Sequence, residues 1–321
     1  MLKPFGGELP IKDFIEQSFF TDSGRSSLLL FIRSIGKDTK FLIPDFLCPI
    51  IVEILTSEQV LFDYYHIKKD LSIDEETVNN KNFEVFYCIN YFGQLQNLEN
   101  LDIKNKILVE DNVFLYNFEN RQKHSKWFAF NSFRKISPLS DGSLIKTNIK
   151  INDKLIDNKG APFSEIKYAA KFNKQKFLEK EKVLEKDYLL LFERGEELLN
   201  NQSSIYTISN RSLYLLFSLL WKKMNTDSKR NFYIFLKETN IKPINLNTEW
   251  YSFFVFYTEQ RDSLIEYLAQ NNFFIPVHWR GNKNSISSQI ISIPIFNTYE
   301  KSYLEQLSFL IKSFYERNNR Q

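Results

Sequence analysis

The chain has 321 residues, of which 43% are hydrophobic and 25% are charged, and its formal net charge is +3. This composition excludes a disordered chain and suits a globular protein with one large core, or with a large and a small domain. Lysine and arginine are scattered along the sequence, so the basic stripe that nucleic acid requires is missing.

The sequence also lacks the features of membrane, exported and metal-binding proteins. The longest uncharged apolar stretch, residues 212–221, has about half the length needed to span a bilayer, and the N-terminal sequence has no apolar signal-peptide core. The two cysteines, Cys48 and Cys88, form neither a disulfide framework nor a zinc-ligand spacing. We therefore expect a soluble, cytoplasmic protein without a metal site.

The first predicted elements are a short helix over residues 11–20 and a turn, TDSGRSS, over residues 21–27. The turn opens a strongly apolar helix, LLLFIRSI. Free backbone N–H groups at a helix start form a natural anion site, to which Ser26 can add a hydroxyl donor. The alternative is a simple N-cap by Ser23 or Asp22.

A series of short apolar runs follows, separated by polar segments. Runs that are apolar throughout are typical of strands buried on both faces, as in a mostly parallel α/β sheet. The runs are residues 40–43, 60–64, 83–89, 106–109, 127–131 and 142–146. Ligands gather at the carboxyl ends of such strands, where this chain places residues 44–46, 90–93, 110–111 and 132–135.

The second half of the chain changes character twice. A charged helical pattern over residues 161–201 indicates a long exposed helix, and residues 205–237 continue as helix. A small α+β unit is then predicted, with strands at 250–257, 273–277 and 290–295 and helices at 262–270 and 299–315. We expect a large domain over residues 1–200 and a small one over residues 201–321.

Two charged residues at strand ends suggest the chemistry. Asp111 and Lys135 are separated by about one crossover's worth of chain, so both can face the carboxyl edge of one sheet. A lysine in this position can hold pyridoxal phosphate as a Schiff base, while an aspartate keeps the pyridine nitrogen protonated. Ser132 and the turn at Gly24 could then hold the phosphate. The alternative is that Lys135 is an ordinary solvated lysine.

The order of the motifs resembles the DegT/DnrJ/EryC1/StrS sugar aminotransferases, a family of fold-type I pyridoxal phosphate enzymes. The resemblance covers most of the chain and rests on these segments: GGE at 6–8, SGRSS at 23–27, IPDFLC at 43–48, NYFGQ at 90–94, VED at 109–111, SFRK with P and DG at 132–142, FFIPVHW at 273–279 and ISIPIF at 291–296. It implies a large domain with a mostly parallel seven-stranded sheet, a small C-terminal α+β domain, and a homodimer with active sites at the subunit interface.

The resemblance also implies roles for single residues. Lys135 matches the Schiff-base lysine and Asp111 the partner of the pyridinium nitrogen. The remaining residues expected to bind the cofactor are Gly24, Arg25, Ser26, Ser132, Cys48, Phe46 and Asn90. Those expected to meet the substrate are His278, Trp279 and Arg280, for which the alternative is a half-buried seam between domains.

The chain departs from the family pattern in four places. Phe114 stands where the family usually has Gln or His near the phenolic oxygen of the cofactor. Cys48 stands where many members have a larger aromatic residue over the cofactor ring, and Phe46 is the next residue placed to stack there. The spacing from Ser132 to Lys135 is shorter than in the commoner pattern, and Arg25 replaces the usual threonine of the phosphate turn.

Together with the site residues, the resemblance predicts an aminotransferase that uses pyridoxal phosphate to move an amino group from a donor such as glutamate to a nucleotide-linked keto sugar. The pathway would be bacterial surface polysaccharide or a related glycoside. One alternative, suggested by Phe114, is a dehydratase or other elimination enzyme with the same cofactor. Another is a catalytically degenerate homologue that serves as a binding or assembly protein.

Overall fold

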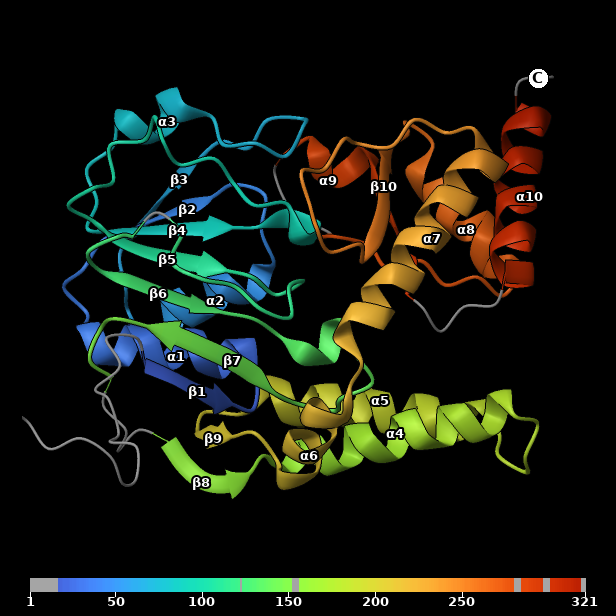
Figure 1. Ribbon diagram of the computed structural model, residues 1–321, viewed down its shortest axis with the longest axis horizontal. Helices are drawn as coiled ribbons and strands as arrows, with labels where there is room; N and C mark the ends of the chain where they lie inside the picture. The colour runs from blue at the N-terminus through green and yellow to red at the C-terminus, as the bar shows by residue number, and fades with distance from the viewer. Residues whose placement is uncertain (1–16, 122, 152–155, 280–283, 297–300, 319–321) are drawn as a thin grey trace, which may run out of the picture.

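The computed structural model describes residues 17–121, 123–151, 156–279, 284–296 and 301–318 (Figure 1). A seven-stranded sheet forms the larger part, in the order β1-β7-β6-β5-β4-β2-β3. Its strands are β1 (Gln17–Thr21), β2 (Phe41–Pro44), β3 (Phe62–Tyr65), β4 (Val85–Ile89), β5 (Ile107–Asp111), β6 (Trp127–Phe130) and β7 (Ser143–Thr147).

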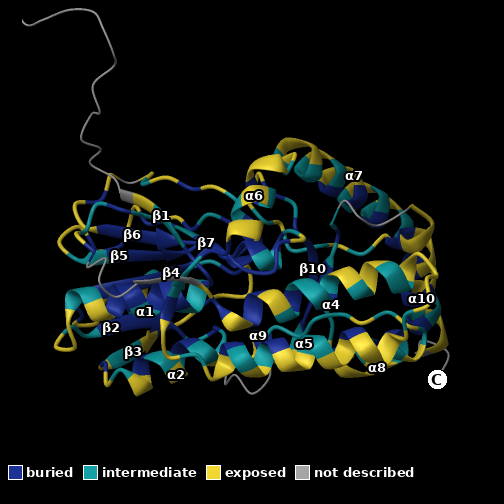
Figure 2. Ribbon diagram, turned by 90° about the horizontal axis from the view of Figure 1, so that it is seen from below, coloured by how far each residue is buried: buried dark blue, intermediate teal, exposed yellow. Residues whose placement is uncertain are grey.

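The sheet is mostly parallel, as predicted. Strands β2 to β6 pair in parallel, whereas β7 runs antiparallel to both β6 and β1. Every residue of β2, β4 and β6 is buried, and Figure 2 shows the sheet as the dark, covered centre of the larger part. Uninterrupted apolar runs thus correspond to strands covered on both faces.

Strand β1 corrects the helix predicted over residues 11–20. Residues 17–21 pair with β7, where Phe19 faces Ile145 and Phe20 faces Leu144. Aromatic and branched side chains that face each other across strands stabilise a sheet, and this pairing overrides the local helical pattern. Residues 11–16 lie outside the described part of the chain.

Helices α1 (Gly24–Ile35), α2 (Pro49–Ser57) and α3 (Glu75–Asn79) follow three of the strands. The predicted apolar helix is α1, which buries Leu28, Leu30 and Phe31 completely. Its N-cap is Ser23, whose side chain accepts a hydrogen bond from the Ser26 N–H. The turn before α1 is therefore capped by the serine that the sequence suggested.

The charged region expected as one long helix is a pair, α4 (Pro162–Leu178) and α5 (Glu185–Asn200). Figure 1 shows them side by side below the sheet and extending away from it. Gly195 permits their close approach, because an added Cβ there would lie 2.7 Å from the Lys167 side chain. Their outward faces are largely exposed (Figure 2).

Residues 205–207, expected as helix, form the short strand β9 (Ile205–Thr207), which pairs with β8 (Ile156–Gly160). Helix α6 (Asn210–Ser218) then packs Leu216 against Phe133 and Leu139 of the larger part. The domain boundary between residues 200 and 201 stays a prediction.

Helix α7 (Trp221–Thr239) leads to a second core, built with β10 (Phe253–Tyr257), α8 (Arg261–Gln270), β11 (Ile290–Pro294) and α10 (Lys301–Asn318). A short helix, α9 (Ile286–Gln289), precedes β11. The strand predicted at 273–277 is wrong, because β10 pairs with β11 alone and residues 273–277 form no element. Pro276 lacks the N–H that a paired strand requires. No helix among the described residues is long and apolar enough to cross a membrane.

Candidate cofactor site

Asp111 and Lys135 meet at the carboxyl edge of the large sheet. Asp111 is the last residue of β5, where it pairs with Phe130 of the parallel neighbour β6. After β6, Ser132 begins a single 3₁₀ turn, η2 (Phe133–Lys135), which ends with the lysine. Two parallel strands that end side by side thus bring together the pair predicted from the sequence.

The Asp111 carboxylate is buried and held in place. The Tyr87 hydroxyl donates a hydrogen bond to Oδ2 at 2.7 Å, and the Val113 N–H donates one to Oδ1 at 3.1 Å. Burial raises the pKa of Asp111, against the opposing effects of Tyr87, Lys135 and Val113. The carboxylate is thus fixed in orientation, and a nearby positive charge would stabilise its ionised form.

The Lys135 amine is half-buried, with its Nζ 5.6 Å from the centre of the Phe114 ring. Burial lowers its pKa, the positive charge of Arg134 lowers it further, and Cys48 and Asp111 act in the opposite direction. Within the described part of the chain, Nζ makes no hydrogen bond or ion pair. Lys135 is therefore unlike a solvated surface lysine: its charged form is less favoured than in water, and its amine is not tied up in a hydrogen bond or ion pair with a described residue.

Phe114 belongs to an aromatic cluster beside this amine. It stacks on Phe92 with ring centres 5.6 Å apart, and it meets Phe253 and His278 edge to face at 5.1 and 5.8 Å. Burial, with a smaller effect of Lys135, lowers the pKa of His278 to about 3. Its Nδ1 lies 2.7 Å from the Ser292 hydroxyl. This wall of the site is therefore apolar, with one neutral imidazole.

The turn before α1 lies against the end of β6. A Cβ added to Gly24 would lie 3.2 Å from the Asn131 carbonyl oxygen and 3.3 Å from the Phe130 ring. Glycine at this position therefore lets α1 begin next to Ser132. The Ser132 side chain is buried, and its hydroxyl has no hydrogen-bond partner among the described residues. A helix start and a free hydroxyl thus lie close together.

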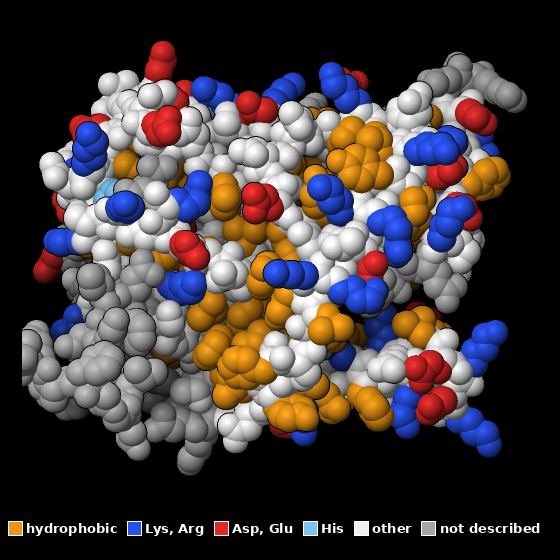
Figure 3. Space-filling model, in the orientation of Figure 1, with side chains coloured by type: hydrophobic (Ala, Val, Ile, Leu, Met, Phe, Trp, Pro, Cys, Tyr) orange, Lys and Arg blue, Asp and Glu red, His pale blue; other side chains and the backbone are white. Residues whose placement is uncertain are grey.

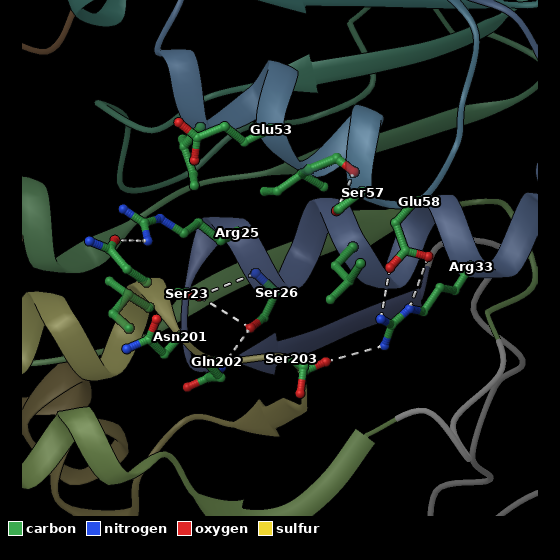
Figure 4. Close-up of a pocket in the computed structure, with 15 residues that line it drawn as sticks. Ser23, Arg25, Ser26, Arg33, Glu53, Ser57, Glu58, Asn201, Gln202 and Ser203 are labelled. Atoms are coloured by element: carbon green, nitrogen blue, oxygen red, sulfur yellow. Dashed lines mark hydrogen bonds and ion pairs between the residues drawn. The ribbon is translucent and has the colours of Figure 1, made fainter.

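The side chains of Arg25 and Ser26 point towards the end of α5 (Figure 4). Arg25 donates a hydrogen bond to Asn200 Oδ1 at 2.6 Å, and Gln202 donates to Ser26 Oγ at 3.3 Å. Both residues line a pocket of about 410 Å³ between α1, α2 and residues 199–203. The Arg25 side chain therefore links α1 to α5, a contact that the sequence did not suggest.

The other predicted cofactor residues occupy different surroundings. Cys48 is half-buried at the start of α2 and is among the groups that act on Lys135. Phe46 is fully buried and stacks on Tyr91 with ring centres 5.4 Å apart. The Asn90 amide donates a 2.6 Å hydrogen bond to Asn112, so it is engaged behind the sheet edge.

Of the predicted substrate residues, His278 packs edge to face against Phe114 beside Lys135, and Trp279 is buried in the larger core. The Trp279 ring lies 4.8 Å from that of Phe46, centre to centre. Arg280 lies outside the described residues, as does the GGE segment at 6–8.

A charged cluster next to Lys135 was missed at the sequence level. Arg134 forms an ion pair at 3.3 Å with Glu196 of α5, and Glu196 also pairs with Lys167 of α4. Lys171, one turn further along α4, donates hydrogen bonds to the loop that follows Lys135. The spacing of Lys167 and Lys171 places both on one face of α4, but the sequence does not indicate what that face contacts.

The fold matches those of several solved aminotransferase structures, each over more than 90% of this chain. The structure is similar to a DegT DnrJ EryC1 StrS aminotransferase from Brucella abortus, with 14% identity, a TM-score of 0.57 and coverage of 92% of this chain and 85% of the other. It is also similar to Helicobacter pylori PseC, an aminotransferase involved in the biosynthesis of pseudoaminic acid (14% identity, TM-score 0.63, coverage 94% and 87%).

A third similar structure is the aminotransferase TlmJ from Streptoalloteichus hindustanus, with 10% identity, a TM-score of 0.65 and coverage of 94% and 87%. No protein-family model matches the sequence, and no curated protein matches it. At such identities the likeness establishes the fold, and the chemistry must be argued from the residues of the site.

Proposed function

We propose that the chain is a divergent member of the DegT/DnrJ/EryC1/StrS family and works as a pyridoxal phosphate-dependent aminotransferase. Its substrates would be a nucleotide-linked keto sugar and an amino donor such as glutamate. The pathway would make bacterial surface polysaccharide or a related glycoside in the cytoplasm. The observation that carries the proposal is the free amine of Lys135 beside the fixed carboxylate of Asp111 at the carboxyl edge of the sheet.

The residues present fit this cofactor. Asp111 keeps acceptor capacity beyond its two hydrogen bonds and could hold the protonated ring nitrogen. The Ser132 hydroxyl makes no hydrogen bond among the described residues and lies near the start of α1, where the phosphate could bind. When bound, pyridoxal phosphate supplies an electron sink for negative charge at the substrate carbon.

Lys135 would bind the aldehyde and later move a proton. Its lowered pKa increases the fraction of neutral amine, the form that attacks a carbonyl and accepts a proton. Asp111 would hold the proton on the ring nitrogen by its charge. Phe92, Phe114 and Phe253 would exclude water from this side of the site.

An exposed apolar surface supports the proposed homodimer. On α6, Tyr214 is 76% exposed and Phe217 is 78% exposed, and Leu220 follows the helix with 68%. Figure 3 shows hydrophobic side chains gathered over the lower centre of this face, where Figure 1 places α6. Apolar patches of this kind commonly mark protein contacts. Sedimentation equilibrium should give twice the chain mass, and a monomer at micromolar concentration would remove this part of the proposal.

The test of the activity uses purified protein and pyridoxal phosphate. The wild type should develop the near-ultraviolet to visible band of the lysine-bound cofactor, and Lys135→Ala should not. Glutamate should then convert the bound cofactor to its amine form. An elimination enzyme would retain the absorption band after glutamate is added, and a degenerate homologue would take up no cofactor. Either result would contradict the proposal of an aminotransferase.

A further inference from the structure

The loop that carries Lys135 is held by one amine from a distant helix. After η2 the chain continues through Ser137 and Leu139 to β7. Lys171 Nζ, from α4, lies 2.6 Å from the Leu139 carbonyl oxygen, 3.2 Å from that of Ser137 and 3.5 Å from that of Arg134. Three backbone carbonyls on both sides of the Lys135–Ile136 turn thus converge on one side chain.

The number of donors matches the number of acceptors. A protonated lysine has three N–H groups and no acceptor, so it can satisfy three carbonyls at once. Within the described part of the chain, Lys171 forms no ion pair with a carboxylate. Its amine is therefore committed to the backbone of this loop, which would otherwise present unsatisfied carbonyls at a partly buried position.

The neighbouring side chain is tied to the same helix pair. The Arg134 guanidinium is bound by Glu196 of α5, and Glu196 is bound by Lys167, one turn before Lys171 on α4. The residue that precedes Lys135 is thus held at its carbonyl by Lys171 and at its side chain by Glu196. Helices α4 and α5 lie outside the sheet, yet they fix the segment that bears the candidate catalytic amine.

We propose that Lys171 is a positioning residue, which fixes the backbone of residues 134–139 so that the Lys135 amine faces Asp111 and Phe114. Only the purpose of this role, which is to present Lys135 to a cofactor, rests on the proposed function. The hold on the loop itself is a property of the protein without cofactor, so it can be tested separately.

The contact between the Lys171 amine and the loop carbonyls depends on pH, because the amine can lose its proton. Burial lowers the pKa of Lys171 to about 7; Arg134 on the loop and Lys167 and Lys174 on α4 lower it too, whereas Asp141, just before β7, raises it. Below this pH the amine offers three N–H groups, and above it only two. One carbonyl therefore loses its donor as the pH rises through about 7.

The experiment compares Lys171→Met, which keeps the length and removes the donors, with Lys171→Arg, which keeps donors and charge. Lys174→Met is the matched control, because Lys174 is exposed and has no hydrogen bond among the described residues. Hydrogen exchange of peptides covering residues 134–139 is measured without pyridoxal phosphate. The Lys135 and Ile136 amides, which bond to Ser132 and Phe133, report the order of the turn.

Lys171→Met should speed exchange of these amides by about tenfold or more, the loss expected for a charge-assisted hydrogen bond, while β4 and α1 stay unchanged. Lys171→Arg should restore part of the protection. Lys174→Met removes one charge that lowers the pKa of Lys171, so it should keep wild-type protection at pH 6, where Lys171 is protonated in both proteins. In wild type the protection, corrected for intrinsic exchange, should fall between pH 6 and about 8, and in Lys171→Arg it should not.

Exchange in Lys171→Met that equals wild type, or that rises equally in β4 and α1, would overturn the proposal. With pyridoxal phosphate, Lys171→Met should bind about tenfold more weakly, and unchanged affinity would also overturn it. Failure of the wild type to take up pyridoxal phosphate would instead remove the proposed function, while the exchange data would still decide whether Lys171 holds the loop.

Discussion

Tyr87 orients the carboxylate that the proposed chemistry requires. Its hydroxyl donates the 2.7 Å hydrogen bond to Asp111 and lowers the pKa of that buried carboxyl. Tyr87→Phe removes this donor, so the ionised form of Asp111 becomes less stable. A hydrogen bond to a charged group contributes about 1.5–3 kcal/mol, and pyridoxal phosphate should bind roughly tenfold more weakly.

Tyr65→Phe is the matched control. The Tyr65 hydroxyl donates to the Tyr87 carbonyl oxygen at 3.0 Å, one residue further from the site. Spectroscopic titration with pyridoxal phosphate should give a larger dissociation constant for Tyr87→Phe and an almost unchanged one for Tyr65→Phe. Equal weakening in both variants would mean that general destabilisation, rather than the Asp111 contact, is responsible.

His278 is expected to stay neutral throughout the working range of pH. Its pKa is lowered to about 3 by burial, with a smaller effect of Lys135. The chain has three histidines, and the NMR signal missing in His278→Gln identifies the one in question. This signal should not shift between pH 5 and 8, whereas a transition near the usual pKa of about 6.5 would contradict the burial of the ring.

At the scale of elements, Gly142 joins the turn before α1 to the turn that bears Lys135. Its N–H donates to the Asp22 carbonyl oxygen at 2.6 Å, and its carbonyl accepts from the Phe133 N–H at 3.0 Å. Its φ is +109°, and an added Cβ would lie 2.6 Å from Ile208 Cδ1. Gly142→Ala should therefore lower the free energy of unfolding by roughly 2–4 kcal/mol.

Gly36→Ala separates the cost of backbone strain from the cost of the steric contact with Ile208. Gly36, after α1, has a φ of +90°, but nothing lies within 4 Å of an added Cβ. Gly36→Ala should lose about 1–3 kcal/mol for backbone strain alone, because φ +90° with ψ 164° suits glycine only, and it should lose less than Gly142→Ala, which adds a steric clash. Urea denaturation of both variants measures the difference, and equal losses would show that the contact with Ile208 has no energetic weight.

The strands of the sheet and the principal site pair could be predicted because their signals are local. Apolar runs marked β2 to β7, and the polar residues that end them marked the carboxyl edge where Asp111 and Lys135 lie. Strand β1 could not be predicted, because its pairing with β7 depends on residues more than a hundred positions away. The contact of α4 with the Lys135 loop was hidden for the same reason: no local pattern shows which surface a helix will meet.

At the scale of the whole molecule, a buried carboxyl should make stability depend on pH. Burial raises the pKa of Asp22 to about 7 from an ordinary value of 3.8, with Asp141 contributing and hydrogen bonds from Ser26, Gln202 and Ser23 opposing. Between these two values the folded protein binds more protons than the unfolded chain. Asp22 therefore lowers stability as the pH rises through this window, and its cost is complete above about pH 7.

Asp22→Asn removes this titration and retains an oxygen that can accept the hydrogen bond from Gln202. The variant should gain stability relative to wild type as the pH rises from 4 to 7, by roughly 1.4 kcal/mol per unit of the pKa difference as an upper limit. Denaturation midpoints across this range measure the gain. A difference between the two proteins that does not change with pH would contradict a raised pKa.

The central claim is that Lys135 is the residue that binds pyridoxal phosphate. The most direct measurement is reduction with borohydride in the presence of the cofactor, followed by mass spectrometry of the peptides. The account predicts a pyridoxyl group on Lys135 as the main product, and no comparable label elsewhere in Lys135→Arg. Label on another lysine, such as Lys171, label spread over surface lysines, or no label at all would contradict it.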